Sequence, residues 1–308
     1  MIDRLINGII KTQNPTALGL DTRIEYLPDQ GRSIDSFAAA GEAVYEFNRA
    51  MIDAAQGLIP VVKLQVAYYE MYGLPGMKAF GDTIDYAHKK GMLVIADCKR
   101  NDIGATAECY SAAYLGKTRL GNTEQAAYDA DFLTVTPYLG FDGIQPFIKD
   151  CKTHDKGIFI LVKTSNPSSG QLQDIVLSDG RTVYELIGDY VADWGKDNIG
   201  SHGYSDIGAV IGATYPEQGE TMRKRLPHVF FLMPGYGAQG AAGKDLTGYF
   251  DSSGLGGIVN ASRSLICAYR SKKYEGSGMT PEEAMHEEAK AMRKDITENL
   301  KLCGKWEL

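Results

Sequence analysis

The chain has 308 residues, enough for one large domain or two ordinary ones. Hydrophobic residues make up 44% of the sequence and charged residues 23%, a composition that excludes a disordered or collagen-like chain. The net charge of -7 excludes a general positive field for nucleic acid or an anionic membrane surface, so an anionic substrate would need a local site.

The cysteines and the N-terminal residues indicate the cellular compartment of the protein. The five cysteines are scattered, odd in number and never spaced C-x-x-C, which predicts free thiols in a cytoplasmic protein. The opening sequence MIDRLINGIIKTQ carries charges among its apolar residues and predicts an amphipathic helix instead of an export signal. No window has the roughly 18 uncharged apolar residues of a membrane span. We therefore expect no membrane partner.

Short apolar runs rich in β-branched residues alternate with helical patterns along the chain, as buried parallel strands do. Eight runs are predicted to be strands: Ala17–Leu20, Ile59–Leu64, Met92–Ala96, Phe132–Thr136, Gly157–Val162, Gly208–Ile211, Val229–Met233 and Gly257–Asn260. An open doubly wound sheet would show the same alternation, but eight units is the number at which a parallel sheet closes. The pattern therefore favours a (β/α)8 TIM barrel, with residues 1–308 forming a single domain.

Two segments extend this predicted barrel beyond its minimum. An insert at about 166–206 follows the fifth strand, with a small hairpin expected at Asp179, and long inserts at this end of a barrel often cover the site. A C-terminal helix is predicted at about 281–302, where Thr280 and Glu283 form a capping box. We expect this helix to serve packing alone.

Charged side chains follow the first three predicted strands, at the ends that would form the mouth of the barrel. The first strand ends in Asp21, the second in Lys63, and the third continues through Asp97, Lys99 and Asp102. Since residues two apart share one face of a strand, Asp97 and Lys99 are predicted to point the same way. A lysine between carboxylates keeps its proton, which makes Lys99 an acid or an electrostatic clamp. The alternatives are a solvated turn after the third strand and a structural ion pair for Lys63.

The last two strands are followed by a different set of groups. Pro234, Gly235, Gly237 and Gln239 follow the seventh strand, and Arg263 follows the eighth. Many barrels bind phosphate here, with glycine amides and one guanidinium. Residues 235–240 also spell G-x-G-x-x-G, but only 68 residues follow them, too few for the rest of a dinucleotide-binding domain.

The fifth strand ends in polar residues whose role the spacing leaves open. Lys163, Thr164, Ser165 and Asn166 could bind a flat ring rich in heteroatoms, or they could be ordinary turn residues. The sequence has no G-x-S-x-G motif, and its five histidines show no paired ligand spacing. It therefore predicts neither a histidine-based hydrolase nor a zinc enzyme.

Together these motifs resemble the orotidine 5′-monophosphate decarboxylase family. The resemblance rests on D-x-K-x-x-D and IGATA at the third strand, P-G-x-G-A-Q-G at the seventh and S-R at the eighth. With LGLD, VVKLQ and LVKTSNPSS, the motifs run in order from Asp21 to Arg263, and the longer loops are similar to those of the larger bacterial subgroup.

The resemblance implies a homodimeric lyase that converts orotidine 5′-monophosphate to uridine 5′-monophosphate and carbon dioxide, the last step of de novo pyrimidine nucleotide synthesis. It implies no cofactor and no metal, and the net charge already argues against a nucleic-acid partner. Lys99 would protonate the ring carbon that loses the carboxylate, and Asp97 would lie against that carboxylate. Asp102 and Thr106 would reach into the site of the partner subunit.

The resemblance also assigns the substrate contacts. Asp21 and Lys63 would complete the charged array and touch ribose hydroxyls. Ser165 would bind the pyrimidine edge, although Thr164 is chemically similar. Gln239 and Arg263 would hold the phosphate, beside Pro234, Gly235 and Gly237.

Two other functions fit the same sequence. A sugar-phosphate decarboxylase or synthase of the same superfamily would share D-x-K-x-x-D but use magnesium and an enediolate. A catalytically inactive nucleotide-binding barrel would act as a sensor or scaffold.

Overall fold

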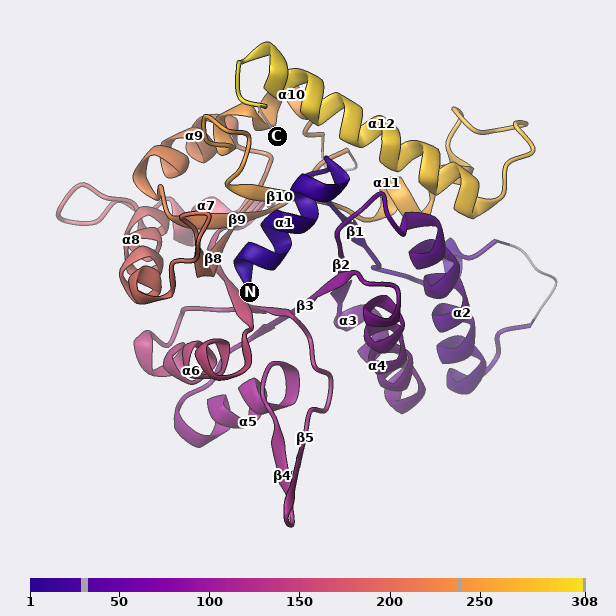
Figure 1. The fold of residues 1–308 in the computed structure, drawn as a ribbon, viewed down its shortest axis with the longest axis horizontal. Coiled ribbons are helices and arrows are strands. Elements are labelled where there is room, and N and C mark those ends of the chain that lie inside the picture. Colours follow the sequence, from indigo (N-terminus) through magenta and orange to yellow (C-terminus); the bar gives the residue numbers. More distant parts are fainter. Residues whose placement is uncertain (29–32, 238–239, 307–308) are drawn as a thin grey trace.

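A computed structural model describes residues 1–28, 33–237 and 240–306 of the chain. Within these residues, eight parallel strands close into a barrel in the order β1-β10-β9-β8-β7-β6-β3-β2, which confirms the predicted (β/α)8 fold (Figure 1). The strands are β1 (Thr16–Gly19), β2 (Val61–Gln65), β3 (Leu93–Arg100), β6 (Phe132–Val135), β7 (Gly157–Lys163), β8 (Ser205–Ile211), β9 (Val229–Pro234) and β10 (Gly257–Ala261).

Helices surround the barrel, as the buried faces of its strands require (Figure 1). They are α1 (Ile2–Thr12), α2 (Phe37–Ala55), α3 (Ala67–Glu70), α4 (Gly73–Lys89), α5 (Gly104–Tyr114), α6 (Gln145–His154), α7 (Gly170–Gln173), α8 (Val183–Gly195), α9 (Pro216–Arg225), α10 (Gly243–Leu246), α11 (Arg263–Ile266) and α12 (Pro281–Leu302). No helix in the described part of the chain is long and apolar enough to cross a membrane.

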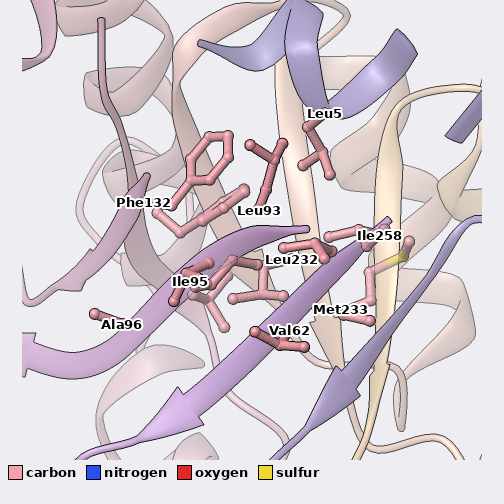
Figure 2. Close-up of a cluster of buried hydrophobic side chains, with 14 of the residues drawn as sticks. Leu5, Val62, Leu93, Ile95, Ala96, Phe132, Leu232, Met233 and Ile258 are labelled. Carbon is pink, nitrogen blue, oxygen red and sulfur yellow. The ribbon is translucent and has the colours of Figure 1, made fainter. Parts of the chain in front are cut away.

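The N-terminal helix covers the end of the barrel at which the strands begin. The amide of Ile2 donates to the Asp206 carboxylate at the start of β8, over 2.7 Å. Leu5 of α1 is fully buried and lies among strand side chains that include Ile95 and Ile258 (Figure 2). This end of the barrel is therefore sealed by apolar packing, and only the opposite end, where the strands finish, is left for a site.

Each of the eight predicted strands is present, with shifted ends. β2 starts after Pro60, which has no N–H to donate to the sheet. β3 continues to Arg100, beyond the predicted end, with a register shift against β6. One antiparallel hairpin, β4 (Thr118–Leu120) with β5 (Thr123–Gln125), was not predicted; it extends away from the barrel (Figure 1) and its residues are exposed.

The insert and the tail have the predicted local structure. The hairpin at Asp179 is closed by the Leu177 amide, which donates to the Arg181 carbonyl over 2.7 Å. A capping box then starts α8. A second capping box starts α12, where the Thr280 hydroxyl accepts from the Glu283 amide and the Glu283 carboxylate accepts from the Thr280 amide.

Candidate active site

The ends of the first three strands bring four of the predicted residues into one chain of ion pairs. The Lys63 Nζ lies 3.0 Å from Asp21 Oδ1 and 3.1 Å from Asp97 Oδ2. The Lys99 Nζ lies 2.6 Å from the other oxygen of Asp97, Oδ1. Carboxylate and ammonium groups thus alternate from Asp21 through Lys63 and Asp97 to Lys99.

Burial and charge act against each other within this chain, and charge prevails. Burial alone would lower the pKa of Lys63, but the Asp21 and Asp97 carboxylates outweigh it and hold the pKa above its usual value. Burial alone would raise the pKa of Asp97, but the Lys63 and Lys99 ammonium groups hold that pKa well below its usual range. Asp97 is therefore a carboxylate and Lys63 an ammonium at neutral pH.

The two lysines differ in their access to solvent. The Lys63 side chain is only 4% exposed, whereas that of Lys99 is 44% exposed. Lys63 is thus largely an internal counter-charge with a small exposed part, and Lys99 is the more accessible cation for a bound molecule.

Two neutral side chains that the sequence analysis missed complete the surroundings of Asp97. The Gln65 amide donates to Oδ2 over 3.1 Å, and the Thr134 hydroxyl donates to Oδ1 over 2.9 Å. Each oxygen of Asp97 thus accepts one bond from a lysine and one from a neutral donor, which fills the capacity of a carboxylate. Gln65 belongs to the VVKLQ motif and could have been noticed there, whereas Thr134 lies within an apolar strand.

Asp102 and Thr106 lie apart from this array. Asp102 follows β3, and its Oδ1 accepts from the Ile103 amide over 2.8 Å; it forms no ion pair with any residue that the structure describes. Thr106 lies on α5 and is exposed. Large apolar side chains are exposed on the loops after β3 and β6, with Ile103 at 55% and Tyr138 at 81%.

The two hydroxyls after β7 differ in their hydrogen bonds. The Thr164 hydroxyl donates to Asn166 Oδ1 over 2.6 Å and accepts from the Gln173 amide over 2.8 Å. The Ser165 hydroxyl has no hydrogen-bond partner among the residues described and remains available to a ligand. Lys163 is buried and pairs with Asp174 over 2.7 Å, which makes it a structural residue.

The predicted phosphate loop has glycines where the backbone requires them. Gly235 and Gly237 follow Pro234 at the end of β9. Their φ angles are 117° and 71°, which residues with a side chain rarely adopt. The Gly237 amide is already used, since it donates to the Ala241 carbonyl over 2.9 Å. Gln239 falls outside the described residues.

Arg263 borders a cleft beside this loop. It is the first residue of α11, is exposed, and forms no ion pair with another described residue. The cleft has a volume of about 630 Å³ and is also lined by Gly237, Arg270 and Lys273. These three cations outnumber the one carboxylate among the described residues of the cleft, Glu288, which pairs with Lys273 over 2.6 Å, so the cleft keeps a positive character that suits an anion.

Comparison with known proteins shows the family to which the chain belongs. The model of the orotidine 5′-phosphate decarboxylase / HUMPS family matches residues 32–274. The chain belongs to this family. A Rhodopirellula baltica orotidine 5′-phosphate decarboxylase is 42% identical over 87% of this chain and 88% of the relative. A Caldicellulosiruptor bescii orotidine 5′-phosphate decarboxylase is 42% identical over 87% of this chain and 90% of its own length.

Solved structures agree with this family membership. The structure of Leishmania donovani OMP decarboxylase has a TM-score of 0.71 and 27% identity, covering 95% of this chain and 98% of that chain. The resemblance drawn from the sequence motifs is confirmed, and the chain is an enzyme of the decarboxylase type. The ends of the barrel strands place the charged array where barrel enzymes carry their active sites.

Proposed function

We propose that the chain removes the carboxylate of orotidine 5′-monophosphate and releases uridine 5′-monophosphate and carbon dioxide, as the last step of pyrimidine nucleotide synthesis in the cytoplasm. The observation that carries the proposal is the ion-paired array that ends in the accessible ammonium of Lys99. Family membership supports it. We further infer that residues 1–308 act as one domain.

The chemistry of the reaction explains why such an array is needed. When the bond between the ring and the carboxylate breaks, its electron pair stays on the ring carbon, in the plane of the ring. This pair cannot delocalise into the π system, so the developing charge must be stabilised electrostatically. Lys99 supplies a fixed ammonium beside that carbon and donates a proton to it, and such preorganised groups commonly contribute several kcal/mol.

Asp97 has a second role in this proposal. A carboxylate with four donors around it is held in place and stays ionised. Set against the substrate carboxylate, it raises the energy of the bound ground state, and loss of carbon dioxide relieves that repulsion. Binding of the remote phosphate supplies the energy that holds the two carboxylates together.

The remaining predicted residues would bind the parts of the substrate that do not react. Asp21 and Lys63 contact the ribose hydroxyls, and the available hydroxyl of Ser165 contacts the pyrimidine edge. The phosphate lies against Arg263 and the loop that contains Pro234, Gly235, Gly237 and Gln239. Exposure of Arg263 and its lack of an ion pair among the described residues support this assignment.

Turnover in the presence of a chelator tests the proposed function. When purified protein is added to orotidine 5′-monophosphate in EDTA-treated buffer, the absorbance of the substrate is expected to fall as uridine 5′-monophosphate forms. Strict dependence on magnesium would favour a sugar-phosphate decarboxylase or synthase. Nucleotide binding without turnover would favour a sensor or scaffold.

We also infer that two copies form a dimer with shared sites, in which Asp102 and Thr106 act in the partner subunit. Three observations support this: Asp102 has no ion pair within the described chain, Thr106 is exposed, and Ile103 and Tyr138 expose apolar surface nearby. A cation and a carboxylate that lie apart in one subunit could meet across a dimer interface.

Hybrid dimers test the shared site. Lys99→Ala and Asp102→Asn chains are each expected to be nearly inactive, because each lacks one group at every site. When the two are unfolded and refolded together in equal amounts, half of the dimers are hybrids with one intact site, so about a quarter of the wild-type activity returns. If Asp102 acts within its own chain, no activity returns.

A further inference from the structure

The Thr134 hydroxyl connects the backbone of Lys99 to the Asp97 carboxylate that holds the Lys99 ammonium. Its Oγ1 lies 2.9 Å from Asp97 Oδ1 and 3.0 Å from the backbone nitrogen of Lys99. An ionised carboxylate can only accept, so the Thr134 hydrogen points to Asp97 and its lone pair receives the Lys99 N–H. The roles of donor and acceptor at this hydroxyl are thereby fixed.

These contacts close a ring that begins and ends in Lys99. From the backbone nitrogen of Lys99 the ring passes to Thr134 Oγ1, then to Asp97 Oδ1, and returns to the Lys99 Nζ over 2.6 Å. Thr134 is 1% exposed, so solvent does not compete for its hydroxyl. A single carboxylate oxygen, Asp97 Oδ1, thus holds the ammonium of Lys99 directly and its backbone N–H through Thr134.

The backbone at Lys99 has an unusual conformation that needs such support. Its φ angle is 50°, in the left-handed region that is strained for a residue with a side chain. β3 advances four residues, from Ala96 to Arg100, while β6 advances only two, from Leu133 to Val135. Lys99 lies in this irregular stretch, and Thr134 lies opposite it on β6.

We propose that Thr134 is a positioning residue for the decarboxylation, which holds Lys99 in its left-handed conformation and the Asp97 carboxylate in the rotamer that receives the ammonium. The inference rests on the proposed function, because the role of Lys99 does. Without the hydroxyl, the Lys99 N–H loses its partner, and the left-handed conformation is no longer stabilised. The ammonium then moves away from the position at which charge develops, and such displacements reduce turnover more than binding.

Four variants separate the hydroxyl from the rest of the side chain. Thr134→Val keeps the shape and removes the hydroxyl, while Thr134→Ser and Thr134→Ala differ from each other mainly by that hydroxyl. Thr16→Val is the matched control, because Thr16 is also a buried strand threonine. It lies at the start of β1, and its hydroxyl donates to Asn14 Oδ1 over 2.7 Å. For each variant we would measure kcat and KM for orotidine 5′-monophosphate, the Kd for uridine 5′-monophosphate, and the thermal midpoint.

The expected result is a loss of turnover that follows the hydroxyl. Thr134→Val and Thr134→Ala should lower kcat by about 10- to 100-fold, with the Kd for the product changed by less than about threefold. Thr134→Ser should stay within about fivefold of wild type, and Thr16→Val should keep the wild-type kcat even if its thermal midpoint falls. Full turnover in Thr134→Val and Thr134→Ala would overturn the proposal, as would a loss in Thr134→Ser equal to that in Thr134→Ala.

Crystallography of Thr134→Val gives a readout that does not depend on activity. Lys99 is expected to leave the positive φ region, or its Nζ to move out of hydrogen-bond range of Asp97 Oδ1. A variant that keeps both features would contradict the positioning role. If wild-type protein fails to decarboxylate orotidine 5′-monophosphate, the proposed function is wrong, and the Lys99 geometry in this variant still decides whether Thr134 positions it.

Discussion

The two sides of the barrel mouth are built in different ways. At the ends of β1, β2, β3 and β6, every charged group of the array has its partner inside the protein, and Asp97 alone accepts four hydrogen bonds. At the ends of β7, β9 and β10, the Ser165 hydroxyl and the Arg263 guanidinium have no such partner among the described residues. One side is complete without a ligand, and the other has groups left to bind one.

This difference separates the two tasks of the proposed reaction. Stabilising a charge that exists only in the transition state requires groups that are already oriented, because reorienting them during the reaction would cost energy. Binding a phosphate has no such requirement, since exposed groups can bond to the ligand as it arrives. The comparison therefore predicts that substitutions on the first side reduce turnover or stability, whereas substitutions on the second side weaken binding.

Replacing the exposed lysine of the array should have the largest effect. Lys99→Ala removes the proposed acid and the cation beside the carbanion, so kcat should fall by at least about 1,000-fold. The circular dichroism spectrum should be unchanged, because the Lys99 side chain is 44% exposed and Asp97 keeps its bond to Lys63. Lys196→Ala is the control: this surface lysine pairs with Asp193 and should leave kcat unchanged. Undiminished decarboxylation by Lys99→Ala would contradict the assigned role.

The buried lysine of the array should affect stability as well. Lys63→Met leaves Asp21 and Asp97 without their shared cation, and removing one partner of a buried ion pair costs about 3–5 kcal/mol of unfolding free energy. Lys78→Met breaks an exposed pair with Asp82 and is the control, with little expected change. Urea unfolding at neutral pH measures both. A Lys63→Met protein as stable as the control would show that the array contributes nothing to folding.

The effect of Lys63 should depend on pH in one direction. Its pKa is raised in the folded protein, so its contribution to stability is complete below the unfolded value of about 10.4 and is lost as the pH rises toward the folded value. The difference between wild type and Lys63→Met should therefore be nearly constant from neutral pH to about pH 10 and shrink above it.

The sequence predicted the barrel and the array because both follow from local patterns. Continuous apolar runs indicate buried parallel strands, and a charge directly after such a run must lie at a strand end. Asp21 and Asp97 each meet that condition, and Lys63 lies one residue before the end of its predicted run, so the fold alone brings the three together.

What the sequence did not predict depends on contacts between distant segments. The irregular register at Lys99 breaks the two-residue period on which strand predictions rest. Thr134 looked like one more residue of an apolar strand, because its importance comes from two atoms of β3 that the sequence cannot place. The β4–β5 hairpin was missed although Gly121 and Asn122 form a turn pair, since its short strands bury nothing.

Arg263→Ala should have the smallest effect of these substitutions. In contrast to Lys63→Met, it should weaken substrate binding and leave stability unchanged. Losing the guanidinium removes charged hydrogen bonds to the phosphate, so KM for orotidine 5′-monophosphate should rise by about 10- to 100-fold. The thermal midpoint should stay at the wild-type value, because Arg263 is exposed and has no ion pair with any described residue. If the midpoint fell while KM stayed unchanged, Arg263 would be a structural residue and the phosphate would bind elsewhere. An increase in KM at constant stability would show that this side of the mouth is completed by its ligand.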